Sequence, residues 1–409
     1  MSRLVKDLVT ELPKSPLPAG FASEGSGFVF FVSGPKPLEC EQGLIDGEAI
    51  VLSTGGNAAI HYGKGNFSYS TDCWALEPLV NLVDGKYLYY FLDSQIFRID
   101  ALGFEGSGLK HLRKDFVRNY KVPEFSKPEQ CKITEVLSTV DRAIEQTEAL
   151  IAKQQRIKIG LMQNLLTRGI DKHGNLRSEE THQFKDSPLG RIPVEWEVAP
   201  ISKYGSRSRP YLRTGPFGSD LNTKHWVEYG IPVLTIGSLG EGIVLQSELL
   251  FIDDKTADRL KGFRVEEGDI VFSRVADIGR SLVIKPGCES WIISSNLMRI
   301  SLDKKAASPD YLYRNIAFNS EIRAQLRKTS NSGGRDLVNG PILNALIFPW
   351  PSIDEQLEVN KRLQGTDNRL KGINENLQKL YALKTGLMQD LLTGKVPVTP
   401  LIAKMEDRS

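Results

Sequence analysis

The chain of 409 residues contains few cysteines, and the four present form no Cys-x-x-Cys pair. A disulfide framework and a structural zinc site are therefore not expected. Long apolar runs are also missing, since none approaches the roughly 20 residues that cross a bilayer. The first residues lack the apolar core of a signal peptide. These features predict a reduced, cytoplasmic protein with no membrane partner.

An excess of positive charge is absent too, because 52 Lys and Arg against 50 Asp and Glu give a net charge of +2. A protein that wraps nucleic acid over a basic surface usually carries more charge. Any contact with DNA or RNA must therefore come from local patches or from partners.

Catalytic motifs are equally scarce. The sequence has no phosphate-binding Gly-x-x-x-x-Gly-Lys-Ser/Thr loop, no Gly-x-Ser-x-Gly and no His-Glu-x-x-His, and its five histidines stand apart. We therefore expect this chain to have no catalytic site, no metal site and no cofactor of its own.

What the sequence does contain is a long internal repeat. Residues 349–393 match residues 123–167 without a gap, at a constant offset of 226. Chance similarity does not hold its register over such a length. Each copy starts with the Ser-x-x-Glu pattern of a capping box and ends near a glycine, Gly169 or Gly394. Each copy is predicted to be one helix of roughly 60 Å, called a rod below.

Apolar residues recur along both rods at spacings that alternate between four and three residues, the period of a coiled coil. Two matched rods with such seams are explained most simply by packing on each other. Two separate helices, each packed on its own domain, are the alternative. Two lysines at equivalent seam positions either fix the register or mark where the seam splays. The predicted seam and register residues are Ile133, Leu137, Ile144, Lys158, Leu161, Leu363, Leu370, Leu377, Lys384 and Leu387.

The segments outside the rods have short β-rich runs between glycine-rich turns. Short matches between them at offsets of 220 and 224 indicate that the whole chain is a duplication of globule plus rod. The predicted divisions are a first globule at 1–122, a rod at 123–169, a polar linker at 170–194, a second globule at 195–347, a rod at 348–397 and a tail at 398–409.

The rods also carry a family resemblance. Residues 158–169, Lys-Ile-Gly-Leu-Met-Gln-Asn-Leu-Leu-Thr-Arg-Gly, and their second copy strongly resemble the specificity subunit of type I restriction–modification enzymes. Residues 187–193, Trp196 and the Gly-Pro-Phe-Gly-Ser run at 215–219 look like the start of that family's second target-recognition domain. The resemblance spans about residues 45–397.

The resemblance implies an α+β fold with an internal pseudo-twofold duplication. Two mixed α/β target-recognition domains would each read half of a split sequence in double-stranded DNA, and the rods would pack as an antiparallel coiled coil that sets the spacer. DNA adenine methyltransferase subunits, two in number, would bring S-adenosylmethionine and methylate a flipped adenine. Motor-nuclease subunits would use ATP and magnesium to cleave DNA. This chain would supply specificity as a non-catalytic subunit of that complex.

Basic clusters lie on loops of both globules, and such loops can neutralise phosphates or reach guanine edges; an ordinary solvated face is the alternative. The first globule has no clear Gly-Pro-Phe-Gly-Ser counterpart. We therefore pair Ser53-Thr54 with Ser273-Arg274, and residues 106–110 with 332–335. The predicted DNA-binding residues are Ser53, Thr54, Lys64, Lys110, His111, Ser219, Arg274, Arg280, Asn296 and Arg335.

Two other functions remain open from the sequence. One is a non-catalytic coiled-coil adaptor or scaffold whose globules bind protein. The other is a self-sufficient nuclease or methyltransferase, which the missing motifs disfavour.

Overall fold

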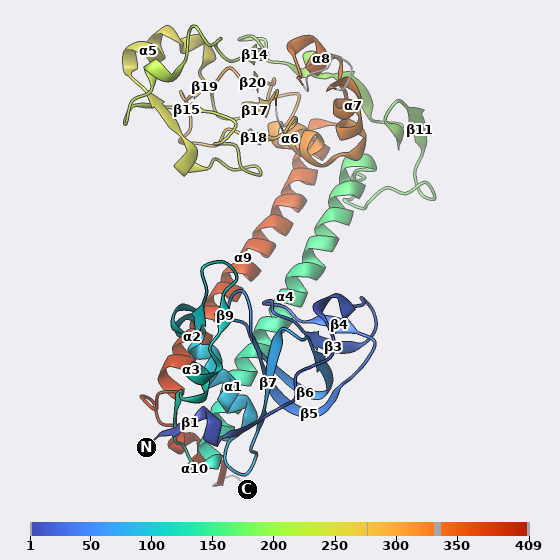
Figure 1. The fold of residues 1–409 in the computed structure, drawn as a ribbon. Helices are drawn as coiled ribbons and strands as arrows, with labels where there is room; N and C mark the ends of the chain where they lie inside the picture. The colour runs from blue at the N-terminus through green and yellow to red at the C-terminus, as the bar shows by residue number, and fades with distance from the viewer. Residues whose placement is uncertain (1, 276, 331–336, 407–409) are drawn as a thin grey trace. The chain divides into compact units, whose positions relative to one another are not determined.

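The computed structural model describes residues 2–275, 277–330 and 337–406. The chain divides into two compact units: unit 1 comprises Met1–Ile151 and Ile373–Ser409, and unit 2 comprises Ala152–Gly372. Two long helices, α4 (Lys127–Thr167) and α9 (Ile353–Leu391), are the rods, and each contributes residues to both units (Figure 1). No helix among the described residues is long and apolar enough to cross a membrane.

Unit 1 is built on a six-stranded sheet whose central strand, β5, is buried along its second half. In spatial order its strands are β2 (Val9–Glu11), β7 (Cys73–Pro78), β5 (Ile45–Ser53), β6 (Ile60–Tyr69), β3 (Phe28–Phe31) and β4 (Leu38–Cys40). The unit also contains the strand pairs β1 (Ser2–Leu4) with β10 (Lys121–Pro123) and β8 (Phe104–Glu105) with β9 (His111–Leu112), and helices α1 (Gly85–Ser94), α2 (Ile96–Gly103), α3 (Lys114–Arg118) and α10 (Thr399–Glu406).

Unit 2 contains a four-stranded sheet in the order β14 (Leu212–Thr214), β20 (Leu297–Ile300), β17 (Ile270–Ser273) and β18 (Ser281–Val283). A three-stranded sheet has the order β16 (Leu250–Ile252), β15 (Ile231–Leu234) and β19 (Ile292–Ile293). The remaining elements are the pairs β11 (Phe184–Ser187) with β12 (Gly190–Pro193) and β13 (Glu197–Pro200) with β21 (Ile347–Trp350), and helices α5 (Asp254–Arg259), α6 (Pro309–Phe318), α7 (Ser320–Ser330) and α8 (Gly340–Ala345).

The strand pairing of unit 2 repeats that of unit 1. The order β14-β20-β17-β18 follows β2-β7-β5-β6, and β15 pairs parallel to β19 and antiparallel to β16 as β3 does to β6 and β4. The single long strand β6 thus corresponds to two strands, β18 and β19. Most of the extra residues of the second copy lie in the loop between β15 and β16 and in the segment with α5. The predicted duplication of globule plus rod is therefore confirmed.

One buried glutamine in each rod makes the same contacts in both units. The side-chain oxygen of Gln130 accepts a hydrogen bond from the backbone of Asp84 at 2.7 Å, and that of Gln356 accepts one from Ser308 at 2.8 Å. Both bonds hold the start of the first helix of a globule, α1 or α6, against a rod. An identical polar contact at equivalent positions shows that the rods and globules were duplicated together.

The rods run antiparallel in each unit. In unit 1, Asp141 of α4 contacts Lys384 of α9, and Glu148, further along α4, contacts Tyr381, which comes earlier in α9. In unit 2, Lys158 of α4 forms an ion pair with Asp367 of α9 at 2.6 Å. Apolar seam positions at i, i+3 and i+4 therefore face each other across the two helices.

The predicted seam is largely buried. Leu161 and Leu387 are partly buried, while Ile133, Leu137, Ile144, Leu363, Leu370 and Leu377 are at most 9% exposed. Ile133 and Leu137 also pack into the core of the first globule with Leu391. The helices therefore pack on each other, as predicted, and they pack on their own globules as well.

Each capping box is only half formed. At the first rod, the Glu129 carboxylate accepts a hydrogen bond from the Ser126 backbone, as predicted, but the Ser126 hydroxyl donates to that carboxylate instead of accepting from the helix backbone. At the second, the hydroxyl of Ser352 accepts from the Glu355 backbone at 3.3 Å, but the Glu355 carboxylate turns to Arg177. A buried guanidinium attracts that carboxylate more strongly than the exposed backbone at the helix start.

Two segments assigned to connections are structured. The stretch 170–194 contains the β11–β12 hairpin and buries Ile170 and Leu189, while residues 399–406 form α10 and Val398 packs into the core of unit 1. Glycines 169 and 394, at φ +62° and +73°, stop the two rods as predicted.

A buried histidine predicts a pH dependence for unit 1. His61 stacks on Phe31, and its Nε2 lies 2.8 Å from the Gly34 carbonyl. Burial lowers the pKa of His61, although backbone hydrogen bonds oppose the shift. Because the folded-state pKa lies below the ordinary value of about 6.5, the contribution to stability is complete above that pH and is lost as the pH falls toward the folded-state pKa.

We expect the midpoint temperature of thermal unfolding to decrease as the pH is lowered from 7.5 to 5.5, roughly the range in which an ordinary histidine titrates. The decrease should be smaller in His61→Gln. Thermal melts across this range measure the difference. Identical pH profiles for the two proteins would refute the assignment to His61.

Candidate nucleic-acid interface

Four strand ends of unit 2 meet at one edge of its sheet. β14 and β17 end there, at Thr214 and Ser273, and β20 and β18 begin there, because the neighbouring strands are antiparallel. The loops that leave this edge, residues 215–222, 273–280 and 294–297, are called the strand-end loops of unit 2. They carry Ser219, Arg274, Arg280 and Asn296, so the structure brings four predicted DNA-binding residues to one edge.

Backbone hydrogen bonds fasten these loops to one another. The backbone N–H of Arg274 donates to the carbonyl of Asn296 at 3.1 Å, and that of Gly215 donates to Leu297 at 3.0 Å. Gly215 has to be glycine, since a Cβ there would lie 2.0 Å from the carbonyl oxygen of Ser294. The loops thus form a fixed platform rather than independent segments.

Arg274 is the most available cation on this platform. Its carbonyl accepts a hydrogen bond from Val338 at 2.8 Å, which fixes its backbone on the second side. Its side chain is half-buried, and its Nε is a buried atom without a hydrogen-bond partner among the residues that the structure describes, so contact with DNA would have to come from the end of the guanidinium. Asn296 and Ser219, on the other two strand-end loops, are exposed. An arginine held this way can donate two hydrogen bonds to a guanine edge.

Arg280 is less available than the sequence suggested. Its Nε donates to the carboxylate of Asp277 at 2.6 Å, and its Nη1 to the carbonyl of Leu239 at 3.3 Å. These contacts shape the loop that follows β17. The predicted residue Arg335 lies outside the described residues.

Unit 1 has the same arrangement at the equivalent positions. The backbone N–H of Thr54 donates to the backbone carbonyl of Asp72 at 2.9 Å, and the Thr54 carbonyl accepts from the backbone N–H of Leu112 at 3.0 Å. A further bond, from Gly56 to the carbonyl of Lys110, ties in the segment that carries His111. Residues 53–59, 70–72 and 106–112 are therefore the strand-end loops of unit 1. Thr54, Lys110 and His111 meet there, and Thr54 holds the position that Arg274 holds in unit 2.

Two predicted residues do not belong to this surface. Ser53 is 1% exposed, and its hydroxyl donates to Asn57 at 2.8 Å and accepts from the Ala59 backbone at 2.9 Å, so it shapes the loop from inside. Lys64 is exposed but pairs with Glu48 in the strand register, four residue pairs from the loop end of β6. That spacing puts Lys64 about 13 Å along the strand.

The sequence reasoning missed Asp72, which occupies the position of Asn296 and is exposed. The offset of 224 that relates the two copies in this region would have found it. Unit 1 thus presents a carboxylate, which can accept from a cytosine amino group, where unit 2 presents an amide that can contact adenine. The two platforms share a backbone frame and differ in chemistry.

Several arginines of the basic clusters are ion-paired. Arg118 holds the pKa of Glu11 below its usual range through a hydrogen bond, and Arg209 contacts Asp269 and Glu266. Carboxylates paired in this way reduce the local positive potential of the clusters. The clusters alone therefore do not define a phosphate-binding surface.

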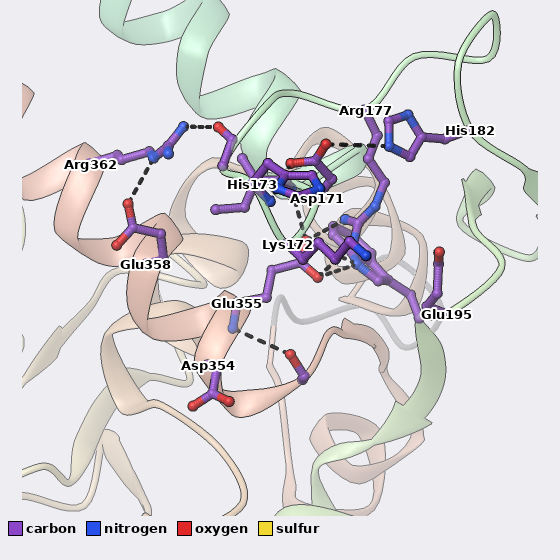
Figure 2. A pocket seen from close by; sticks show the side chains of 14 residues that line it. Asp171, Lys172, His173, Arg177, His182, Glu195, Asp354, Glu355, Glu358 and Arg362 are labelled. Carbon is purple, nitrogen blue, oxygen red and sulfur yellow. Dashed lines mark hydrogen bonds and ion pairs between the residues drawn. The ribbon is translucent and has the colours of Figure 1, made fainter.

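A polar cavity of about 960 Å³ lies in unit 2 where α4 ends and α9 begins (Figure 2). Its charged side chains largely neutralise each other: Arg177 pairs with Glu355, and Arg362 pairs with Glu358 at 3.0 Å and donates to the carbonyl of Gly174 at 2.6 Å. These contacts fasten residues 170–177 to the second rod. The residues that line the cavity therefore have a structural role, since they connect the end of α4 to the start of α9.

Comparison with known proteins identifies the group to which this chain is similar. A family model described as the type I restriction modification DNA specificity domain matches residues 34–154 and 217–381. The MjaVIII type I restriction enzyme specificity subunit of Methanocaldococcus jannaschii is 25% identical over 369 residues, which cover 87% of this chain and 80% of the relative. The EcoBI specificity subunit of Escherichia coli is 24% identical over 315 residues, 75% of this chain and 64% of the relative.

Solved structures share the fold. The S subunit of a type I restriction–modification system from M. genitalium covers 96% of this chain and 95% of its own, with a TM-score of 0.62 and 17% identity. A chain from a structure on complex assembly and conformational transition of the type I system has a TM-score of 0.57 and 13% identity, covering 96% of this chain and 97% of its own.

Proposed function

We propose, from the premise that this chain belongs to the type I restriction modification DNA specificity family, that it selects the DNA sequence on which a methyltransferase and restriction complex acts. Each unit reads one half of a bipartite target with its strand-end loops. The rods set the number of base pairs between the two halves. The observation that carries the proposal is the repeated platform, fastened by the same two backbone hydrogen bonds at Thr54 and at Arg274.

The platforms suit sequence reading because their backbones match while the side chains at equivalent positions differ. A bipartite target needs two readers of similar shape and different base preference. Thr54 and Asp72 in unit 1, against Arg274 and Asn296 in unit 2, supply that difference. Base edges are read by such donors and acceptors, whereas phosphate contacts only position the protein.

Partners complete the proposed function. DNA adenine methyltransferase subunits, two in number, bring S-adenosylmethionine and methylate adenine, and motor-nuclease subunits use ATP and magnesium to cleave DNA. This chain is the non-catalytic member of the complex. The chain's net charge of +2 supports this division, because partners that grip the phosphates relieve the specificity subunit of that task.

Deleting the gene from its host tests the function. We expect a bipartite methylated motif to disappear from the genome while other methylated motifs remain, because the methyltransferase loses its sequence guide. Single-molecule sequencing before and after deletion, and after restoring the gene, measures this. An unchanged set of motifs, together with no binding of duplex DNA by the chain with its partners, would favour the adaptor function instead.

A further inference from the structure

Each unit contains one aspartate that joins three elements. In unit 1, Asp141 of α4 forms an ion pair with Lys384 of α9 at 2.8 Å and accepts a hydrogen bond from the hydroxyl of Tyr90 in α1 at 2.5 Å. We call these three residues the Asp141 cluster. It connects both rods and the first helix of the globule at one point.

Unit 2 has an equivalent group, the Asp367 cluster. Asp367 of α9 forms an ion pair with Lys158 of α4 at 2.6 Å and contacts the Arg314 guanidinium of α6 at 3.0 Å. The offset of 226 relates the aspartates and the lysines, and an offset of 224 relates Tyr90 to Arg314. The contact pattern is therefore duplicated, although the globule's donor changed from a phenol to a guanidinium.

The globule side of each cluster is rigid. Tyr90 is fully buried and Arg314 is 7% exposed, whereas the ion pairs between the rods are about one-quarter exposed. Partly exposed ion pairs hold helices in register only weakly. A buried hydroxyl or guanidinium on a carboxylate is a directional contact that water does not weaken, and in unit 1 the Tyr90 hydroxyl also lies 3.2 Å from the hydroxyl of Ser138 on the same rod. The clusters are therefore better suited to fix the rotation of a globule about its rods than to stabilise the rods.

We propose that Asp141 and Asp367, with Tyr90 and Arg314, are positioning residues that fix the angle of each recognition platform relative to the rods, and thereby the spacer length that the complex accepts. This inference rests on the proposed function. A DNA duplex turns with every added base pair, so a platform held at one angle accepts one spacer, and a loosened platform also accepts neighbouring lengths. Base choice within each half-site depends on the strand-end loops and stays unchanged.

Tyr90→Phe is the sharpest test, because it removes only the hydroxyl that joins globule to rod. Tyr381→Phe is the matched control: its hydroxyl also binds a carboxylate of α4, Glu148, but it comes from the other rod and is exposed. Each variant replaces the wild-type gene in the host. Plasmids then carry the two wild-type half-sites at spacers from one base pair shorter to one longer, and their methylation is measured by sequencing.

We expect Tyr90→Phe to raise methylation at the off-length spacers about fivefold, the population shift that one typical hydrogen bond gives. Tyr381→Phe should match the wild type. Unchanged spacer selectivity in Tyr90→Phe, or altered base choice, would overturn the proposal. If Tyr90→Phe does not accumulate, Arg314→Met tests the second cluster with the same expected outcome. Absence of any bipartite motif in the wild-type host would instead contradict the proposed function itself.

Discussion

Glu355→Gln should destabilise unit 2 by about 3–5 kcal/mol, the cost of removing one partner from a buried ion pair. Glu355 and Arg177 are only 10% and 8% exposed in their side chains. The carboxylate also accepts hydrogen bonds from the Ile170 backbone at 2.9 Å and from the Trp196 indole at 3.3 Å. An amide cannot balance the buried guanidinium or serve all these donors.

Urea unfolding followed by tryptophan fluorescence measures this loss. Glu358→Gln, one turn further along α9, is the matched control, because its pair with Arg362 is more than one-third exposed on both sides and should contribute little to stability. Replacing both partners, as Arg177→Met with Glu355→Gln, should recover part of the loss since no buried charge remains. Equal destabilisation by Glu355→Gln and Glu358→Gln would show that burial does not govern the pair.

Arg274→Ala should relax base choice at one position of one half-site and leave the other half-site unchanged. A bidentate contact from arginine to guanine is worth about 1–3 kcal/mol of discrimination, so we expect roughly 5- to 150-fold weaker preference at that position. The backbone of Arg274 is held on both sides, by Asn296 and Val338. The truncation should therefore leave the platform in place.

Methylome sequencing of a host that carries Arg274→Ala checks this, and the unaltered half-site serves as the internal control. Thr54→Ala, at the equivalent position of unit 1, should affect only the opposite half-site. A relaxation of both half-sites by Arg274→Ala, or an unchanged motif, would remove Arg274 from the base-reading residues.

The long helices were predicted well because the spacing of apolar residues along each of them is a local signal. The predicted rods at 123–169 and 348–397 contain α4 and α9, and the seam follows from spacing alone. What the sequence could not provide was the partner of each seam lysine. Asp141 and Asp367 meet Lys384 and Lys158 only because the rods run antiparallel in one register, and a single helix pattern does not specify that.

The candidate site was predicted in outline but not in detail. Pairing Ser53-Thr54 with Ser273-Arg274 located both platforms, because the strand that leads into each loop survived duplication. The pattern could not tell that Ser53 points inward or that Glu355 would leave its capping position for Arg177, since burial depends on contacts distant in sequence. Equivalent residues can therefore make different contacts: Glu129 accepts from the backbone at the start of its helix, whereas Glu355 pairs with Arg177.

Most of the extra residues of the second copy lie before β17, chiefly in the loop between β15 and β16 and in the segment with α5. From Ser53 or Ser273 onward, the two copies keep nearly the same spacing through to the ends of the rods. The longest insertions and the conserved spacing thus lie in separate stretches of each copy. Insertions before β17 can change one unit without shifting its strand-end loops relative to its rod. New specificities can therefore evolve in one unit at a time.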